Sequence, residues 1–431
     1  MKKSLNNSQF APETFREFFQ IFLKVGLLSF GGPAAQISMM HRILVDETKW
    51  LKEQQFLNAL SFCMFLPGPE AMQLATYAGW RLKGVIGGLV AGLLFVLPGA
   101  LVMLALAIIY AHFGNISIMN TFFLGIKAAV LIIVIEALMR VSNKALKNKA
   151  SWVLAAAAFI GIFFLKLPYP LIVLLAAAYG FFFMAKETEE ATEINQKPVA
   201  HLKTLMTIAV GLFIWALPFI ILHMTTSNSI LTDIGAFFSK LAIVTFGGAY
   251  AVLAYMGQDV VSQYGWLSPG QMMDGLGLAE TTPGPLILVT EFVGFLAGFK
   301  EGGLWLGISG ALMTLWVTFV PCFLWIFAGA PYIEWISAQP RLSGALSAIT
   351  AAVVGVILNL SIWFGLHVFF AKVTPTSYGP VTLWQPDLSS LNWQVVALSC
   401  LCGLLLLKFH WGITRVLLIS ATAAFGLSFI S

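Results

Sequence analysis

The chain has 431 residues, of which 59% are hydrophobic and 10% are charged, and its formal net charge is +5. Soluble domains carry about 25% charged residues, so this composition excludes an ordinary soluble protein and predicts a chain embedded in a lipid bilayer. The 24 lysines and arginines lie mostly in short loops and form no long basic face, which excludes nucleic acid as a partner.

Apolar runs recur along the whole chain, each long enough to cross a hydrocarbon core of about 30 Å. They lie near residues 17–40, 56–80, 85–111, 117–140, 151–165, 169–185, 203–223, 236–258, 271–298, 303–329, 341–371, 392–407 and 410–430. The sequence therefore predicts an all-α polytopic membrane protein with about 13 transmembrane segments.

The charges in the loops predict the orientation in the membrane. Arg140, Lys144, Lys147 and Lys149 form the most basic loop. Because cytoplasmic loops are enriched in Lys and Arg, we expect this loop and the N-terminus in the cytoplasm. With thirteen segments, the C-terminus is then expected outside.

The chain also repeats itself. A shift of 216 residues aligns FLKVGLLSFGGPAA (22–35) with FSKLAIVTFGGAYA (238–251) and, without a gap, pairs Trp50 with Trp266. Between residues 22 and 69, 15 of 48 positions are identical. At a shift of 223, KAAVLIIVIE (127–136) aligns weakly with TAAVVGVILN (350–359). A duplicated unit explains such a match better than chance does.

Seven segments separate the starts of the two units. Because seven is odd, the second unit enters the membrane from the opposite side, which makes an inverted repeat of the kind that secondary transporters use. The expected division is a first repeat at 1–185, a polar cytoplasmic linker at 186–200, and a second repeat at 201–431 with its motif core at 236–371.

Each unit places Pro-Gly-Pro inside an apolar run. The two copies are Pro67-Gly68-Pro69 and Pro283-Gly284-Pro285. Proline removes a backbone donor and breaks a helix, and the freed backbone groups are tolerated in a membrane only in a cavity or in packed protein. Half-helix N-termini at such breaks suit an anion. The two breaks therefore predict a transport site, although Pro-Gly-Pro that only bends packed helices remains an alternative.

A glycine pair and a lysine accompany each break. The residues are Lys24, Gly31, Gly32 and Pro33 in the first unit, and Lys240, Gly247 and Gly248 in the second. A lysine inside the membrane costs about 2.5–3.5 kcal/mol, so both lysines are candidate anion ligands. The alternatives are snorkelling of the lysines to the interface and close helix packing by the glycines.

Polar side chains near the breaks are candidate substrate and proton sites. Gln36, Gln73, Thr281 and Thr282 are neutral donors. Glu70 and Glu280 are candidate proton carriers, because burial disfavours a charged carboxylate. Glu280 could instead satisfy a broken helix end. The histidines and cysteines make no metal-ligand spacing, and phosphate-loop, dinucleotide and HExxH motifs are absent, so we predict no enzyme, no metal and no cofactor.

Five longer motifs resemble a known family. They are GLLSFGGPAAQISMMH (26–41), FLPGPEAMQLATYAGW (65–80), TFGGAYAVLAYMGQDVV (245–261), DGLGLAETTPGP (274–285) and WVTFVPCFLWIFAGAPYIE (316–334). They look like the chromate ion transporter (CHR) family in its long two-domain bacterial form. The resemblance implies a multi-pass plasma-membrane protein that exports chromate from the cytoplasm, with proton antiport as the usual proposal.

The family's motif positions fall on residues already singled out. They are Gly31, Gly32, Pro33, Gln36, Pro67, Gly68, Pro69, Gln73, Gly247, Gly248, Glu280, Pro283, Gly284 and Pro285. Three residues depart from the family's pattern. Gln36 stands where many members have His, Glu70 replaces a small residue, and Glu291 stands where Gln is expected. These departures put the identity of the transported ion in question.

The working hypothesis is alternating access by two inverted units around a midplane site. One rival is a carrier of sulfate or other tetrahedral oxyanions, which competition measurements would distinguish. A second rival is a membrane-embedded chromate reductase, which would need a flavin, haem or Fe–S cofactor, so a colourless purified protein would exclude it. A third is a passive anion channel, which would conduct with no dependence on a proton gradient. The sequence leaves open whether the protein is a homo-oligomer and whether Pro-Gly-Pro lies in a spanning or a re-entrant segment.

Overall fold

The computed structural model describes residues 14–114, 116–184, 201–225, 229–246, 249–333, 339–379 and 381–428, together with Pro12 and Ile336. The predicted linker 186–200 and the pair Gly247 and Gly248 lie outside these residues. Almost all of the described chain is helical, as predicted. One antiparallel hairpin of strands, β1 (Val373–Tyr378) and β2 (Val381–Pro386), was not predicted.

The helices follow the same order twice. The first repeat contains α1 (Phe15–Leu27), α2 (Gly32–His41), α3 (Glu53–Phe65), α4 (Glu70–Phe113), α5 (Ser117–Ala145), α6 (Lys149–Phe163) and α7 (Tyr169–Phe183). The second contains α9 (Ser229–Val244), α10 (Ala249–Ser262), α11 (Pro269–Thr281), α12 (Val289–Gly329), α14 (Pro340–Phe369), α15 (Trp393–Gly403) and α16 (Ile413–Leu427). Short helices of other types accompany these, π-helical at Arg42–Glu47 and Leu404–Lys408 and 3₁₀ at Leu286–Leu288 (η3), Ala330–Tyr332 and Leu388–Ser390. The helix α8 (His201–Thr225) lies between the repeats and has no counterpart in the first.

The long helices α4 and α12 each fold back on themselves. The backbone leaves the helical region at Lys83 and Gly84, and again at Gly302 and Gly303. Gly84 and Gly303 have φ of 66° and 76°, which glycine adopts without a steric penalty. In α4, residue 79 lies against residue 87, so the halves 70–82 and 85–113 run antiparallel. The same turn in both repeats is direct structural support for the duplication.

Among the residues that the structure describes, five helices are long and apolar enough to cross a membrane, and four shorter apolar helices accompany them. The second half of α4, residues 85–113, is about 43 Å long at 1.5 Å per residue and therefore connects the two faces of a bilayer. We call the faces at its two ends the Lys83 side and the Phe113 side. The helix α8 has no buried residue and exposes large apolar side chains, as a lipid-facing helix does.

The first predicted segment, 17–40, is a re-entrant pair of half-helices. Trp50 stacks on Phe18 and lies 6.5 Å from the ring of Phe22, and Glu47 pairs with Lys24 at 3.7 Å. The chain that follows α2 has therefore returned alongside α1. At 13 residues, α1 is only about 20 Å long, too short to cross the hydrocarbon core alone.

The second repeat closes in the same way. Tyr255 of α10 lies 6.0 Å from Phe237 and 5.8 Å from the Lys240 ammonium, both on α9. Trp266, the counterpart of Trp50, stacks on Phe238, the counterpart of Phe22. The segment 236–258 is therefore a second re-entrant pair.

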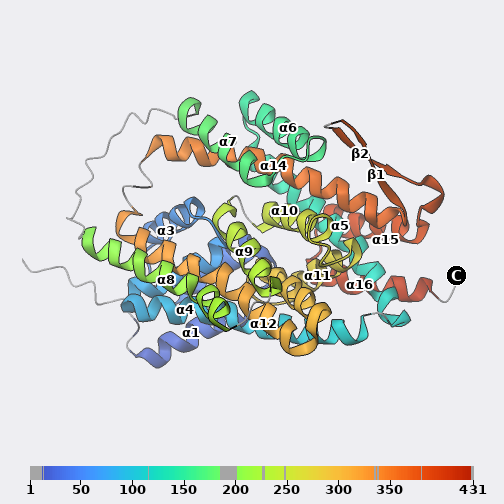
Figure 1. Ribbon diagram of the computed structural model, residues 1–431. Helices are drawn as coiled ribbons and strands as arrows, with labels where there is room; N and C mark the ends of the chain where they lie inside the picture. Colours follow the sequence, from blue (N-terminus) through green and yellow to red (C-terminus); the bar gives the residue numbers. More distant parts are fainter. Residues whose placement is uncertain are drawn as a thin grey trace, which may run out of the picture.

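The second halves of α4 and α12 pack side by side (Figure 1). Phe323 of α12 lies against Gly92, and Phe327 lies against Gly88. Because residue numbers rise along one helix as they fall along the other, the two helices are antiparallel. The end of α12 therefore points to the Lys83 side, where the second half of α4 begins.

The two Pro-Gly-Pro sequences are the tips of helical hairpins. In hairpin A (53–82), Phe62 lies against Gly329 and Gly68 lies against Cys322. The residues of α3 before the tip are thus nearer to the Lys83 side than the tip is. Since the other arm also ends at that side, hairpin A enters from and returns to the Lys83 side.

Hairpin B (269–301) enters from the opposite side. Gly275 and Phe292 lie against one another on its two arms. Tyr110, near the Phe113 end of α4, touches both Asp274 and Phe292. Pro283 at the tip lies against Gly99, farther from that end. The two repeats are therefore inverted, and four of the thirteen apolar segments are re-entrant hairpins. Two of these four lie among the seven segments that separate the starts of the two units, which leaves five crossings between them; five is odd, so the inversion is preserved.

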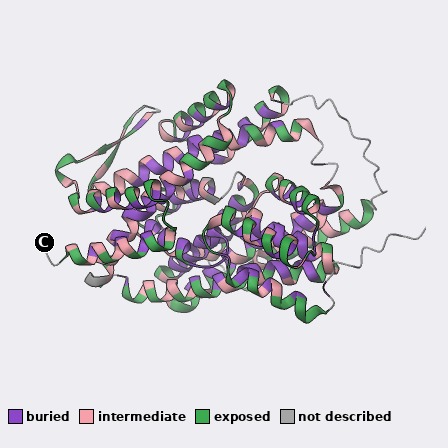
Figure 2. Cartoon of the chain, turned by 180° about the vertical axis from the view of Figure 1, so that it is seen from behind, coloured by how far each residue is buried: buried purple, intermediate pink, exposed green. Residues whose placement is uncertain are grey.

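The repeats exchange their last helices. The helices α6 and α7 pack on α14 of the second repeat, and α15 and α16 pack on α5 of the first (Figure 1). Gly180 of α7 lies against Gly344, and the Ser420 hydroxyl donates to the Gly125 carbonyl at 2.7 Å. Buried residues concentrate between these elements, and exposed residues line the outside (Figure 2). Neither repeat has a complete core by itself.

Gly310 tests the close approach within α12. A Cβ there would collide with the Gly294 carbonyl, whereas Gly426, also helical, has nothing within 4 Å. We expect Gly310→Ala to cost about 1–3 kcal/mol of stability through overpacking. Gly426→Ala should be neutral or stabilising by up to about 1 kcal/mol. Thermal unfolding in detergent compares the two, and equal midpoints would rule out the described contact.

Candidate functional site

The breaks of the two repeats meet through reciprocal hydrogen bonds. The Gly68 amide in the tip of hairpin A donates to the Thr245 carbonyl after α9 at 2.9 Å. The Gly284 amide in the tip of hairpin B donates to the Ser29 carbonyl after α1 at 2.7 Å. Each donor and each acceptor is the 216-residue counterpart of the other. Each repeat therefore pairs the backbone that the break frees in the other repeat.

The residues that end α1 and α9 are alike for a local reason. The Ser29 hydroxyl donates to the Val25 carbonyl, and the Thr245 hydroxyl donates to the Leu241 carbonyl, each at 2.6 Å. Such a back-bond satisfies a hydroxyl inside an apolar segment and leaves the residue's own carbonyl free to accept. That carbonyl is the one that the opposite hairpin tip binds.

Two glutamine side chains fix the tips. Gln36, which is 2% exposed, donates through Nε2 to the Gly284 carbonyl at 2.7 Å and to the Ser29 carbonyl at 3.2 Å. Gln73 donates through Nε2 to the Pro67 carbonyl at 2.7 Å. Both amides therefore satisfy main-chain oxygens that the prolines and glycines leave without a helical partner.

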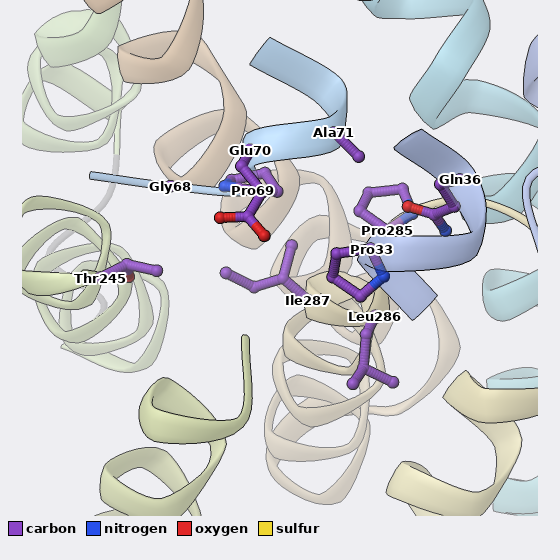
Figure 3. Close-up of a pocket in the computed structure, with 10 residues that line it drawn as sticks. All are labelled: Pro33, Gln36, Gly68, Pro69, Glu70, Ala71, Thr245, Pro285, Leu286 and Ile287. Carbon is purple, nitrogen blue, oxygen red and sulfur yellow. The ribbon is translucent and has the colours of Figure 1, made fainter. Parts of the chain in front are cut away.

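A small cavity lies between the tips (Figure 3). It is lined by Pro33, Gln36, Gly68, Pro69, Glu70, Ala71, Thr245, Pro285, Leu286 and Ile287. Of the predicted site residues, the structure thus brings Pro33, Gln36, Gly68, Pro69, Glu70 and Pro285 into one pocket.

Helix N-termini surround this pocket. The helix α2 begins at Gly32, α4 begins at Glu70 and η3 begins at Leu286, immediately before α12. The first amides of a helix have no partner within the helix and carry a positive partial charge, which suits an anion. Meanwhile two main-chain carbonyls at the breaks, those of Ser29 and Thr245, accept the reciprocal hydrogen bonds. The arrangement therefore favours negative charge in the pocket.

The Glu70 side chain is the ionisable group of this pocket. Its carboxylate points into the space between Thr245 and Ile287 (Figure 3). In the second repeat its counterpart is Leu286, so the two sides of the pocket are alike in backbone but not in charge. An anion that enters meets this carboxyl group directly.

Glu280 lies beside the tip but does not line the pocket. It is 7% exposed, and its Oε1 accepts a hydrogen bond from the Tyr250 hydroxyl at 2.8 Å. Arg140 and Glu136 of α5, paired at 2.9 Å, are close enough to act on it electrostatically. Glu280 therefore bonds to α10 and lies within electrostatic range of the charged pair on α5.

The structure does not bring the two lysines to the pocket. Lys24 pairs with Glu47 and is half exposed, and Lys240 lies over the Tyr255 ring. Both contacts belong to the re-entrant pairs and carry the lysines away from the tips. The hydroxyls of Thr281 and Thr282 donate to the Leu278 and Ala279 carbonyls, so neither offers its proton to a ligand. Gly247 and Gly248 lie outside the described residues.

The sequence reasoning missed three residues near the site. Tyr250 holds Glu280, and Asp274 is a buried carboxylate that contacts Lys127. An aspartate inside the apolar segment 271–298 was a visible signal, because such residues in a membrane are usually functional. The partners Tyr250 and Lys127 could not be found, since they come from other elements.

Gln36→Leu should destabilise the fold. The substitution leaves the buried Gly284 carbonyl without its side-chain donor, which costs about 1–3 kcal/mol. Gln54→Leu is the matched control, because Gln54 is exposed and bonds only to Asn58, and should change stability by less than about 0.5 kcal/mol. Melting temperatures in detergent measure both. A Gln36→Leu variant as stable as the control would refute the tie between the tips.

Comparison with known proteins identifies a family. The family described as Chromate transporter matches residues 16–181 and 232–427. The chromate transport protein of Pseudomonas aeruginosa is 34% identical over 80% of this chain and 80% of its own. That of Cupriavidus metallidurans is 30% identical over 80% and 81%. An uncharacterised transporter of Methanocaldococcus jannaschii is 27% identical over 81% and 84%. No solved structure matches the chain significantly.

Proposed function

The chain belongs to the chromate transporter family, and we propose that it is a secondary transporter that exports chromate across the bacterial plasma membrane. We propose a cytoplasmic N-terminus, from the basic loop at Arg140 to Lys149, and alternating access of the two inverted repeats. The observation that carries the proposal is the pocket between the two Pro-Gly-Pro tips, where helix N-termini from both repeats converge.

The charge of the ion favours export. Moving one charge through 100 mV is worth about 2.3 kcal/mol, so a dianion that leaves a negative interior gains about 4.6 kcal/mol. Uptake of the same ion would need more than two protons to overcome that potential. The membrane potential alone can therefore drive the proposed reaction, and protons would add to or regulate it.

Glu70 and Glu280 are the proposed proton carriers. An ionised Glu70 in the pocket repels a dianion, whereas a protonated Glu70 does not. This geometry favours a proton and the oxyanion bound together, which is cotransport. The family resemblance implies antiport instead, in which the proton and the ion bind in alternate states. The sign of the pH effect separates the two.

Sulfate is the second candidate substrate. Sulfate and chromate share charge and shape, and hydrogen-bond donors at helix N-termini distinguish them poorly. Chromate is therefore the first candidate substrate, because the chain belongs to the chromate transporter family, and sulfate is the second, because of the chemistry of the pocket.

The deciding experiment is uptake of labelled chromate into everted membrane vesicles with an imposed pH gradient. Gradient-dependent uptake that a large excess of sulfate hardly reduces would support a proton-coupled chromate transporter. An acid interior that drives uptake indicates antiport, and an acid exterior that drives it indicates cotransport. Uptake that sulfate abolishes would replace the proposal with a general oxyanion carrier. Uptake that is equal with an acid interior and an acid exterior would remove proton coupling, as expected of a passive channel or of a carrier driven by the membrane potential alone.

A further inference from the structure

The two Pro-Gly-Pro hairpins are packed differently. The helix α11 of hairpin B packs against α5, α14 and α16, and its residues 272–277 are all buried. The corresponding helix α3 packs mainly against α4, and its Leu57, Asn58 and Ser61 are exposed. In alternating access the site opens to one side of the membrane at a time, so the two inverted repeats must have different conformations in any one state. Hairpin B is therefore docked against the helices around it, whereas hairpin A is less closely packed.

An ion pair holds the docked hairpin. Asp274 of α11 accepts a hydrogen bond from the Tyr110 hydroxyl of α4 at 2.8 Å, and its Oδ1 lies 3.4 Å from the Lys127 ammonium of α5. Tyr110 is itself fixed between the rings of Phe123 and Phe292. Asp274 therefore connects hairpin B to α5, a helix of the first repeat against which helices of the second repeat also pack.

This pair is unevenly satisfied. The Asp274 side chain is 5% exposed and its Oδ1 has no hydrogen-bond partner among the described residues, whereas the Lys127 side chain is 24% exposed. A buried pair broken at one partner leaves an uncompensated charge, which is strongly unfavourable. If hairpin B moves away, the Lys127 ammonium group loses its carboxylate partner.

The pair has no charged equivalent in the other repeat. The counterpart of Asp274 is Asn58 and that of Lys127 is Thr350, both neutral. Asp274 lies nine residues before Pro283, about 13 Å along α11 from the tip toward the Phe113 side. The Lys127 ammonium therefore lies between the pocket and the Phe113 side, and the other repeat has no cation at the equivalent position.

We propose that Lys127 is a second oxyanion site, on the Phe113 side of the central pocket, and that the Asp274 carboxylate occupies it while hairpin B is docked. The tetrahedral dianion and the carboxylate compete for the same ammonium group. Arrival of the ion therefore replaces the contact that undocking breaks, and hairpin B opens when the pathway is loaded. This inference rests on the proposed function for the identity of the ion.

A buried reporter tests the docking without measuring transport. Met273→Cys lies one turn before Gly277, which touches Ile126 of α5, and Met273 is 2% exposed. In a chain whose four native cysteines are replaced, we expect an impermeant maleimide to label it slowly. Asp274→Asn should speed labelling from the Phe113 side at least tenfold. The double variant Asp274→Lys with Lys127→Asp exchanges the two charges and should restore slow labelling. The control is Glu301→Gln, which removes an exposed charge at the end of hairpin B and should leave the labelling rate unchanged.

Sulfate is the ligand probe. Added on the Phe113 side, it should speed labelling of the reporter in the parent chain, and Lys127→Met should abolish this response, whereas Lys127→Arg should keep it. Unchanged labelling in Asp274→Asn, or a charge exchange that fails to restore slow labelling in a well-folded variant, would overturn the latch. A sulfate response that survives Lys127→Met would overturn the second site. A chain that transports no chromate but passes these tests refutes the proposed substrate and keeps the docking mechanism.

Discussion

Gly68→Ala and Gly284→Ala are each expected to reduce chromate transport by about two orders of magnitude. Both glycines have positive φ, 120° and 90°, where an L-residue costs about 1–2 kcal/mol. A Cβ at Gly68 would also lie 2.8 Å from the Cys322 sulfur, and overpacking adds about 1–3 kcal/mol. Each change displaces an amide that holds the opposite repeat. Initial rates of chromate uptake, normalised to the amount of protein, measure the effect.

Gly84→Ala and Gly303→Ala are the matched controls. Their φ values are 66° and 76°, so they carry a similar backbone strain, but nothing lies within 4 Å of their added Cβ atoms. They lie at the turns inside α4 and α12, at the opposite end of each hairpin from the Pro-Gly-Pro tip and away from the pocket. The backbone strain should lower the free energy of unfolding by about 1–2 kcal/mol but should not affect the transport step. We therefore expect transport within about threefold of the parent. An equal loss in all four variants would mean that the tips have no special role.

Glu70→Gln and Glu280→Gln are expected to abolish the part of chromate transport that depends on the pH gradient. Glutamine keeps the size of each side chain but cannot take up or release a proton. In Glu70→Gln the pocket also loses its negative charge, so the repulsion between an ionised Glu70 and a dianion is lost. Glu280→Gln can still accept from Tyr250, so its fold should be preserved. Uptake into vesicles at several imposed gradients is the measurement.

Glu301→Gln is the control for both carboxylates. Glu301 is exposed at the turn of α12, so its loss changes the net charge by the same amount without touching the pocket. Proton dependence that survives in Glu70→Gln removes Glu70 from the coupling mechanism, and the same result in Glu280→Gln removes Glu280. If both survive, the coupling lies elsewhere in the chain.

The duplication and its inversion could be predicted because they leave traces in the order of residues. Pro-Gly-Pro and the shared tryptophans repeat at one spacing, and loop parity then determines the relative orientation. The turns at Gly84 and Gly303 were also close to predicted segment boundaries. Local chemistry was sufficient for these features, because proline and glycine break helices wherever they stand.

The return of α2 and α10 could not be predicted. Only Ser29 interrupts Leu27, Leu28 and Phe30 before the glycine pair, and one serine does not end an apolar run, so segment 17–40 has the composition of one continuous span. Contacts between distant residues show that the chain turns back, among them the stacking of Trp50 on Phe18 and the pair of Lys24 with Glu47. The placement of Lys24 depends on that turn. A lysine expected at a midplane site is instead paired with Glu47 beside it.

The exchange of α6 and α7 with α15 and α16 also has a consequence for biogenesis. During translation, α7 is complete at Phe183, but its partner α14 ends only at Phe369, about 190 residues later. At 5–20 residues per second, α6 and α7 wait roughly 10–40 s in the membrane with their packing surfaces uncovered. The first half of the nascent chain is therefore a substrate for membrane chaperones and proteases until the ribosome has finished most of the second half.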